Sequence, residues 1–168
     1  MKLTNGVEQA ICILVLLATQ ENNKPLASDV ISEKLEVSPS YMKKIMRKLV
    51  VGNIVSSVSG TNGGVSLAKE LNDISLLDVI EAMEGPISMF PNTGLIQKAF
   101  KGGIYTDIGE SLIQNLFGQA DALLKDYFSK ITAADMIKEN FGNINAPKLD
   151  WNNVTLSEFL KNKQGDEN

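Results

Sequence analysis

Histidine is absent from this chain of 168 residues, and cysteine occurs once, as Cys12. Without histidine there is no Ser–His–Asp triad, no Cys–His dyad and no histidine-ligated zinc or haem. One cysteine also excludes an intrachain disulfide, a zinc ribbon and a cluster held by several cysteines of one chain. A hydrolase that uses carboxylates alone is the remaining enzymatic alternative, but no paired acids share one predicted face. We therefore predict that the protein is not an enzyme and needs no metal or cofactor.

Long hydrophobic runs are also missing. The longest, residues 10–18, has nine residues, whereas a membrane span needs about 20. Lys2 is the only basic residue before this run and no small-residue cleavage site follows it, so a signal peptide is disfavoured. We expect a cytoplasmic protein without a membrane partner. Cys12 lies inside the run, which favours a buried, unreactive thiol over a redox switch.

Acidic residues are common in the chain but absent from one window. The sequence has 20 acidic residues and a net charge of −4, yet residues 37–69 contain none. The basic residues of this window are Lys43, Lys44, Arg47, Lys48 and Lys69. We interpret the window as a local anion-binding surface on an acidic protein. A solvated helix face is the alternative.

Helix signals surround this window. Thr4 and Asn5 are candidate caps of a first helix whose apolar residues recur at helical spacing from Val7 to Ala18. A second, short helix carries Val30, Ile31 and Leu35. Ser38 as N-cap and Pro39 at the first helical position predict a third helix over residues 39–51. Its expected apolar stripe is Met42, Ile45, Met46, Leu49 and Val50. The opposite, polar stripe is Ser40, Lys43, Lys44, Arg47 and Lys48.

The pattern then changes to two short β-prone runs, residues 54–59 and 65–68, separated by a glycine-rich tip. This predicts a hairpin, because a phosphate-binding glycine loop would lead into a helix instead. Ser75-x-x-Asp78 forms a capping box for a further helix, which ends at Gly85-Pro86. The order predicts a mainly α fold with a small β-hairpin wing: a winged helix-turn-helix domain over residues 1–84.

Residues 85–141 are predicted to hold an irregular linker and a long helix. Its apolar stripe is Ile108, Leu112, Ile113, Leu116, Phe117, Ala120, Leu123, Leu124, Tyr127 and Phe128. We interpret this stripe as a homodimerisation face, since a winged helix closes its core without it; packing against its own domain is the alternative. In the linker region, Met83, Met89, Phe90, Phe100 and Tyr105 are expected either to line an effector pocket or to be core.

Residues 142–168 are predicted to be a C-terminal extension. Before it, a capping box at Thr132-x-x-Asp135 predicts a short helix that carries Met136 and Ile137. The first part of the extension, residues 142–153, is loop-like and contains Trp151, and a further capping box, Thr155-x-x-Glu158, predicts another short helix. Residues 161–168 are expected to fray. The sequence suggests no role for the extension.

Several short motifs occur in order along the first half of the chain. They are Met1-Lys2-Leu3-Thr4, Ser38-x-Ser40-Tyr41-Met42, Gly60-x-x-Gly63-Gly64, Ile74-x-Leu76-x-Asp78-Val79-Ile80 and Glu84-Gly85-Pro86. Together they resemble the IscR/NsrR/CymR family of bacterial transcriptional regulators, whose founding name is Rrf-two. The resemblance covers residues 1–90 and extends more loosely to about residue 140.

The resemblance implies a homodimeric, repressor-type regulator of pseudo-palindromic promoter DNA. It assigns DNA contacts to the start of the third helix and to the wing. These positions are Ser38, Ser40, Tyr41, Lys43 and Lys44, and Gly60, Thr61, Asn62, Gly63 and Gly64. Arg47 and Lys48 join them through the charge pattern. Two departures stand out: Ser59 replaces the arginine that many members carry before the wing glycine, and residues 90–109 lack the cysteines that hold an iron–sulfur cluster.

We therefore predict a sequence-specific transcriptional regulator, of repressor type, that binds double-stranded promoter DNA as a homodimer and carries no cluster. A small-molecule or protein effector is left open. The alternative is a winged-helix module for protein–protein contacts, or a regulatory subunit without DNA specificity. The cationic stripe argues against this alternative, because a purely protein-binding winged helix has no need of it.

Overall fold

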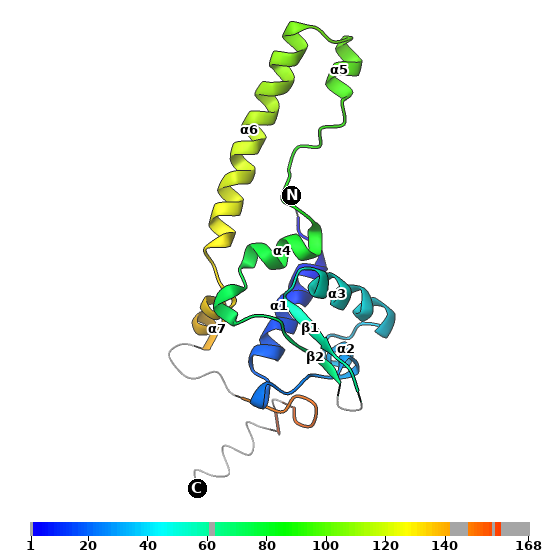
Figure 1. Cartoon of the computed structure of the whole chain (residues 1–168), viewed down its shortest axis with the longest axis vertical. Coiled ribbons are helices and arrows are strands. Elements are labelled where there is room, and N and C mark those ends of the chain that lie inside the picture. The colour runs from blue at the N-terminus through cyan, green and yellow to red at the C-terminus, as the bar shows by residue number, and fades with distance from the viewer. Residues whose placement is uncertain (1, 61–62, 142–147, 156, 159–168) are drawn as a thin grey trace.

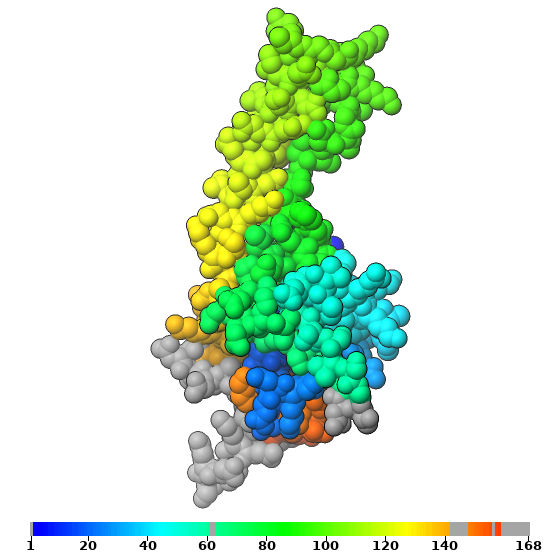
Figure 2. All heavy atoms as spheres, viewed as in Figure 1, coloured from blue at the N-terminus to red at the C-terminus, as the bar shows by residue number. Residues whose placement is uncertain are grey.

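A computed structural model describes residues 2–60, 63–141, 148–155 and 157–158. The chain folds into a winged-helix body from which a long helical arm projects (Figures 1 and 2). The elements of the body are α1 (Asn5–Ala18), η1 (Glu21–Asn23), α2 (Ser28–Lys34), α3 (Pro39–Val51), β1 (Val55–Val58), β2 (Gly64–Leu67), η2 (Leu71–Asp73) and α4 (Leu76–Glu84). Then follow α5 (Leu95–Phe100), α6 (Ile104–Ser129) and α7 (Ala133–Phe141). The predicted mainly α fold with a hairpin is confirmed.

The first helix is the centre of the body. It contacts α3, α4, α7 and β2. Because neighbours surround it, seven of its 14 residues are buried, among them Ala10, Ile13 and Leu14. The core continues through Leu26, Ile45, Leu49, Ile54, Val79 and Ile80.

The third helix begins as its sequence predicts. Ser38 is the N-cap, its Oγ accepts a hydrogen bond from the Tyr41 backbone N–H at 3.3 Å, and Pro39 follows. The buried residues are Met42, Ile45, Met46 and Leu49. Val50 departs from the predicted apolar stripe, since it is 40% exposed. The stripe therefore ends at Leu49.

The wing is an antiparallel pair in which Val55 lies opposite Leu67 and Val58 opposite Gly64. A third segment joins it: Leu26 and Val65 each donate a backbone hydrogen bond to the other's carbonyl, both at 2.9 Å. A Cβ on Gly64 would collide with the carbonyl of Leu26, so only glycine allows this approach. The wing is thus fastened to the segment that leads into α2.

Both ends of α4 match the sequence prediction. The Ser75 N–H donates to Asp78 Oδ2 at 2.9 Å and the Asp78 N–H donates to Ser75 Oγ at 3.0 Å, which is the predicted capping box. Gly85, at φ +87°, ends the helix in a conformation that favours glycine.

The arm contains one element that the sequence analysis missed. The segment expected to be irregular holds the short helix α5, which packs on α6. The long helix begins at Ile104, before the predicted start of its stripe, and has 26 residues of which none is buried. The chain then returns to the body through α7, whose first residue, Ala133, is 1% exposed.

A segment close to the C-terminus also lies on the body. Residues 148–155 pack beside the end of α1 and beside η1, and Leu149 is 3% exposed. The predicted loop character of residues 148–153 is confirmed, but its burial was not foreseen. The predicted loop over residues 142–147 and the fraying of residues 161–168 lie outside the described residues. No helix in the described ranges combines the length and hydrophobicity that a membrane crossing requires.

Candidate nucleic-acid interface

The exposed face of α3 carries a group of unpaired cations. Lys43, Lys44 and Arg47 are all exposed. The ion pairs between described residues involve other lysines, namely Lys24, Lys69 and Lys130. Within that part of the chain no carboxylate neutralises the α3 cations, so their charge faces solvent.

The start of α3 presents polar side chains beside these cations. The hydroxyls of Ser38 and Ser40 lie 3.2 Å apart, and Tyr41 is 40% exposed. Ser38 therefore has a structural task as N-cap, whereas Ser40 and Tyr41 project from the first turn. The helix is held against α2, because the Val37 N–H donates to the Ser32 carbonyl at 3.0 Å and Ser32 is 6% exposed.

Lys48 is engaged differently from the other three cations. Its Nζ donates to the carbonyl of Met83, near the end of α4. This bond ties the second half of α3 to α4. It also satisfies a carbonyl at a helix C-terminus, where a cation is favourable. Sequence periodicity placed Lys48 with Lys43, Lys44 and Arg47, but only the packing of α4 could show that its charge has a partner inside the body.

The basic face of α3 and the wing border a common cleft of about 340 Å³. Lys43, Arg47 and the exposed Val50 line it from α3, and Ser57 lines it from β1. Asp29 of α2 is at its edge and contributes a negative charge. The cleft joins the two elements that the sequence analysis assigned to DNA.

The glycines of the wing have structural reasons of their own. Gly60 has φ +112°, and the Gly63 N–H donates to the Gly60 carbonyl at 2.9 Å. A Cβ on Gly63 would collide with the carbonyl of Val58. The glycines thus shape a tight tip, and Ser59 beside it is exposed. Thr61 and Asn62, both predicted DNA contacts, lie outside the described residues.

The ten predicted dimerisation residues fall into two groups along α6. The inner group lies toward the linker and α4: Phe90 stacks on Phe117 with ring centroids 5.2 Å apart, and the Met89 N–H donates to Asp121 Oδ1 at 3.0 Å. The inner group is Ile113, Phe117, Ala120, Leu124 and Phe128. In the described part of the chain the outer group is 57–72% exposed, with the Tyr127 ring edge-on to the Phe128 ring. The outer group is Ile108, Leu112, Leu116, Leu123 and Tyr127.

The expected effector pocket in the linker region is not formed. Met83 is 5% exposed in the core of the body, while Phe100 and Tyr105 are 71% and 87% exposed at the far end of the arm. These residues therefore neither share a cavity nor all belong to the core. The physical reason is that the linker runs along α6 instead of folding back on the body.

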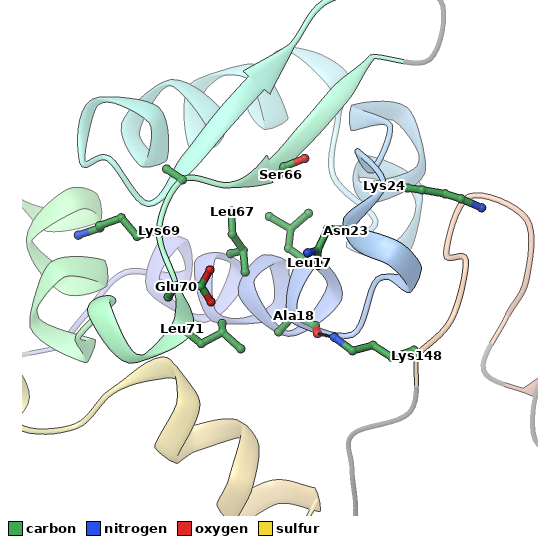
Figure 3. A pocket seen from close by; sticks show the side chains of 11 residues that line it. Leu17, Ala18, Asn23, Lys24, Ser66, Leu67, Lys69, Glu70, Leu71 and Lys148 are labelled. Carbon is green, nitrogen blue, oxygen red and sulfur yellow. Dashed lines mark hydrogen bonds between the residues drawn. The ribbon is translucent and has the colours of Figure 1, made fainter.

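Another cleft lies between α1, β2 and η2 and has a volume of about 500 Å³ (Figure 3). Lys24, Lys69 and Lys148 line it, and each already has a hydrogen-bond or ion-pair partner in the protein. Lys24 pairs with Asp150 at 3.2 Å and Lys69 with Asp78 at 3.8 Å, and Lys148 donates to the Ala18 carbonyl at 2.7 Å. Figure 3 shows Lys24 and Lys69 extending away from the cleft. The cations do not converge as an anion site would require.

The prediction that Cys12 is buried is wrong, because the structure places Cys12 on an exposed side of α1. The apolar run that contains it covers more than one face of the helix, and residue 12 falls on the open side. Partial burial, and then the nearby charge of Glu8, raise the pKa of the Cys12 thiol. The thiolate needed for redox chemistry is therefore disfavoured at neutral pH.

In the described ranges, no three side chains of histidine, cysteine, aspartate or glutamate come together as metal ligands. With Cys12 as the single thiol and no histidine, the residues present do not fit an iron–sulfur cluster.

Comparison with known proteins agrees with this geometry. The family model of Rrf2, described as "Iron-dependent Transcriptional regulator", matches residues 3–139. YffB of Lactococcus lactis, named as an HTH-type transcriptional regulator, is 37% identical over 150 residues, which are 89% of this chain and 96% of YffB. YwgB of Bacillus subtilis, named in the same way, is 47% identical over 102 residues; the match covers 61% of this chain and less than two thirds, 65%, of YwgB.

Solved structures share the fold. CymR, the global cysteine regulator of B. subtilis, superposes with a TM-score of 0.57 at 19% identity, over 81% of this chain and 95% of CymR. A transcriptional regulator from Lactobacillus plantarum reaches a TM-score of 0.60 at 22% identity, over 96% of this chain and 98% of its own. The relatives are named as regulators of transcription and not as enzymes, in agreement with the sequence analysis.

Proposed function

Since this chain belongs to the Rrf2 family of DNA-binding transcriptional regulators, we propose that it is a homodimeric repressor that reads a pseudo-palindromic operator. The observation that carries the proposal is the exposed, unpaired cation group of α3 beside the wing on an otherwise acidic protein. Cations in this position neutralise phosphates, and each contact releases counterions.

In this proposal, residues at different positions along α3 contact different parts of the DNA. Ser40, Tyr41 and Lys43 lie at the helix start, which enters the major groove in helix-turn-helix proteins, and they read base edges. Arg47 lies one turn later and grips a phosphate or a guanine through two hydrogen bonds. The cleft between α3 and the wing accommodates the DNA backbone.

The homodimer rests on the outer group of α6. Five large apolar side chains more than half exposed on one helix face are a contiguous patch of the kind that marks a protein interface. A second copy of the same helix offers an equally apolar face, and a twofold dimer makes such a patch self-complementary. Two linked DNA-binding bodies then bind two half-sites together.

We further propose that this member works without an iron–sulfur cluster, although its family is described as iron-dependent. The single cysteine and the absence of histidine support this. Anaerobic reconstitution with iron and sulfide, followed by visible absorption and iron analysis, should give no stoichiometric cluster. A cluster bound at one per chain or one per dimer would contradict the proposal.

Three measurements test the main proposal. Selection of bound sequences from a random DNA pool should give an inverted repeat, and sedimentation at micromolar concentration should give a dimer. The logarithm of the affinity for the selected site should fall linearly with the logarithm of the salt concentration. If the wild type binds neither the selected DNA nor random duplex in a salt-sensitive manner, the winged helix serves protein contacts instead.

A further inference from the structure

The segment 148–155, here called the C-terminal strap, supplies partners to buried polar groups of the body. Thr19 and Gln20 are each 1% exposed. The Trp151 Nε1–H donates to Thr19 Oγ1 at 2.9 Å, and the Trp151 backbone N–H donates to Gln20 Oε1 at 3.0 Å. Buried polar atoms need such partners, because burial without a hydrogen bond is costly. The strap is therefore an integral part of the folded body.

The strap also extends the backbone pairing of the body. The Leu149 N–H donates to the Thr19 carbonyl at 2.9 Å, and the Glu21 N–H donates to the Leu149 carbonyl at 2.8 Å. These two bonds hold the turn between α1 and α2. In this turn Asn22 and Asn23 have positive φ values, which residues other than glycine seldom adopt.

Asn152 holds the start of α2 from 125 residues away. Its Oδ1 accepts a hydrogen bond from the Ala27 N–H at 3.0 Å, and its Nδ2 donates to the Pro25 carbonyl at 3.2 Å. Ala27 occupies the N-cap of α2 and has no side-chain cap of its own. Asn152 thus bonds the N-cap N–H in the way the N3 side chain of a capping box does.

The residue between these two bonds is Leu26, which pairs with Val65 of the wing. At the other end of α2, Lys34 lies over the Trp151 ring with its Nζ 4.9 Å from the ring centroid. The strap therefore contacts both ends of α2. It also bonds the residues on either side of Leu26, to which the wing is attached. The helix α2 in turn packs against α3.

From these contacts we infer that Asn152 and Trp151 are positioning residues for DNA recognition. They fix α2 and the base of the wing, and through them the spacing between α3 and the wing. The strap does not touch the exposed cation group, so it acts on DNA only through this geometry. The inference rests on the proposed use of α3 and the wing as the DNA-reading surface.

The test compares Asn152→Ala with Asn153→Ala in the full-length protein. Asn153 is a matched control, since its side chain donates to Asp150 inside the strap and makes no bond to the body. Asn152→Asp keeps the acceptor for the Ala27 N–H. Amide hydrogen exchange of Ala27, Leu26 and Val65 is measured without DNA. Affinity for the selected operator and for random duplex is measured well below the unfolding temperature.

We expect Asn152→Ala to speed exchange at all three amides and to lower operator affinity about fivefold to thirtyfold, with a smaller loss on random duplex. Asn152→Asp should recover only part of the affinity, because it keeps the acceptor for the Ala27 N–H but places a second oxygen against the Pro25 carbonyl. Asn153→Ala should match the wild type. Trp151→Ala should give the same pattern as Asn152→Ala. Because exchange is read without DNA, it reports on the strap even if the wild type fails to bind any duplex, which would count against the proposed function alone.

The inference is overturned if Asn152→Ala lowers the unfolding temperature but leaves the Val65 exchange rate and the operator affinity unchanged. It is likewise overturned if Asn152→Ala and Asn153→Ala lose operator affinity equally, since the loss would then not come from the bonds to Pro25 and Ala27.

Discussion

The two longest helices, α1 and α6, both carry apolar stripes, but they differ in how far those stripes are buried. Seven of the 14 residues of α1 are buried, whereas α6, with 26 residues, buries none. Both sequences repeat apolar residues at helical spacing, so the pattern alone does not separate them. The difference is that α1 is surrounded by other elements of its chain, while only the inner group of α6 meets the linker and α4. An apolar stripe shows that a face can be buried, but the rest of the structure decides by what.

The strongest way to test this contrast is to place charge on the outer group of α6. We expect the double variant Leu116→Glu and Leu123→Glu to be a folded monomer, because both side chains lie on the uncovered face. Loss of the linked second half-site should reduce operator affinity by about 10²- to 10⁴-fold. Sedimentation, circular dichroism and operator titration measure these three properties.

The matched control is Gln114→Lys, which adds charge to the exposed side of the same helix, beside Glu110 and away from the outer group. It should stay dimeric and keep its operator affinity. A dimeric double variant, or a wild-type protein that sediments as a monomer, would show that the outer group is not the dimer face.

The second prediction concerns the body, where truncation should affect folding instead of association. Leu49 of α3 is 0% exposed, and Leu49→Ala should lower the free energy of unfolding by about 2–5 kcal/mol. Leu112→Ala on the arm removes the same atoms from a side chain that is 59% exposed. At concentrations where the protein is monomeric it should change that free energy by less than about 0.5 kcal/mol. Denaturant titration distinguishes the two, and equal losses would contradict the contrast.

A third, smaller effect separates the cations of α3. Arg47→Ala should lower the salt slope of DNA binding by about one, since Arg47 is exposed and unpaired among the described residues. Lys48→Ala should change the slope less and lower stability instead, because its Nζ is bonded to the Met83 carbonyl. Ser40→Ala should cost about 1–3 kcal/mol on the operator and less on a scrambled duplex. DNA titrations at several salt concentrations measure the slopes and affinities, and denaturant titration measures the stability of Lys48→Ala. Equal salt slopes for Arg47→Ala and Lys48→Ala would contradict the distinction between an exposed Arg47 and a Lys48 engaged by the Met83 carbonyl.

The smallest predicted effect is a pH dependence of the strap. Burial raises the pKa of the Asp150 carboxyl, but hydrogen bonds from Lys24, Asn153 and Asn152 outweigh it, so the pKa lies below its usual value. A lowered pKa in the folded state contributes stability above the unfolded value, near pH 4, and that stability is lost as pH falls further. Asp150→Asn should therefore flatten the decline of Tm below about pH 4, by less than about 3 °C. An unchanged acid profile would show that Asp150 contributes nothing.

Features that depend on neighbours in sequence were predicted correctly. The N-cap Ser38, the capping box of Ser75 and Asp78, and the hairpin between β1 and β2 all formed where their residues stand. Each depends on contacts within a few residues, which a linear pattern records. The winged-helix fold, which follows from the order of these elements, was predictable for the same reason.

Features that depend on distant segments were missed or only half seen. Val50 and Cys12 are exposed because no element covers their sides of α3 and α1. Lys48 looked like a free cation until α4 brought the Met83 carbonyl to it. The helix α5 was missed because its flanking glycines, Gly94 and Gly102–Gly103, favour a loop, whereas packing against α6 stabilises it.

The amino-acid sequence by itself determined the helices of the body, the caps of α3 and α4, the hairpin and the exposed cations Lys43, Lys44 and Arg47, because these follow from local hydrogen bonding and from periodicity. Tertiary structure alone decided which half of the α6 stripe meets its own chain, which lysine of α3 is bonded to a carbonyl of the body, and that the strap joins the end of α1 to the start of α2. These outcomes join residues as much as 132 positions apart, as in the bond from Trp151 to Thr19. A pattern along the chain records which groups need a partner, but only the folded chain brings that partner within bonding distance.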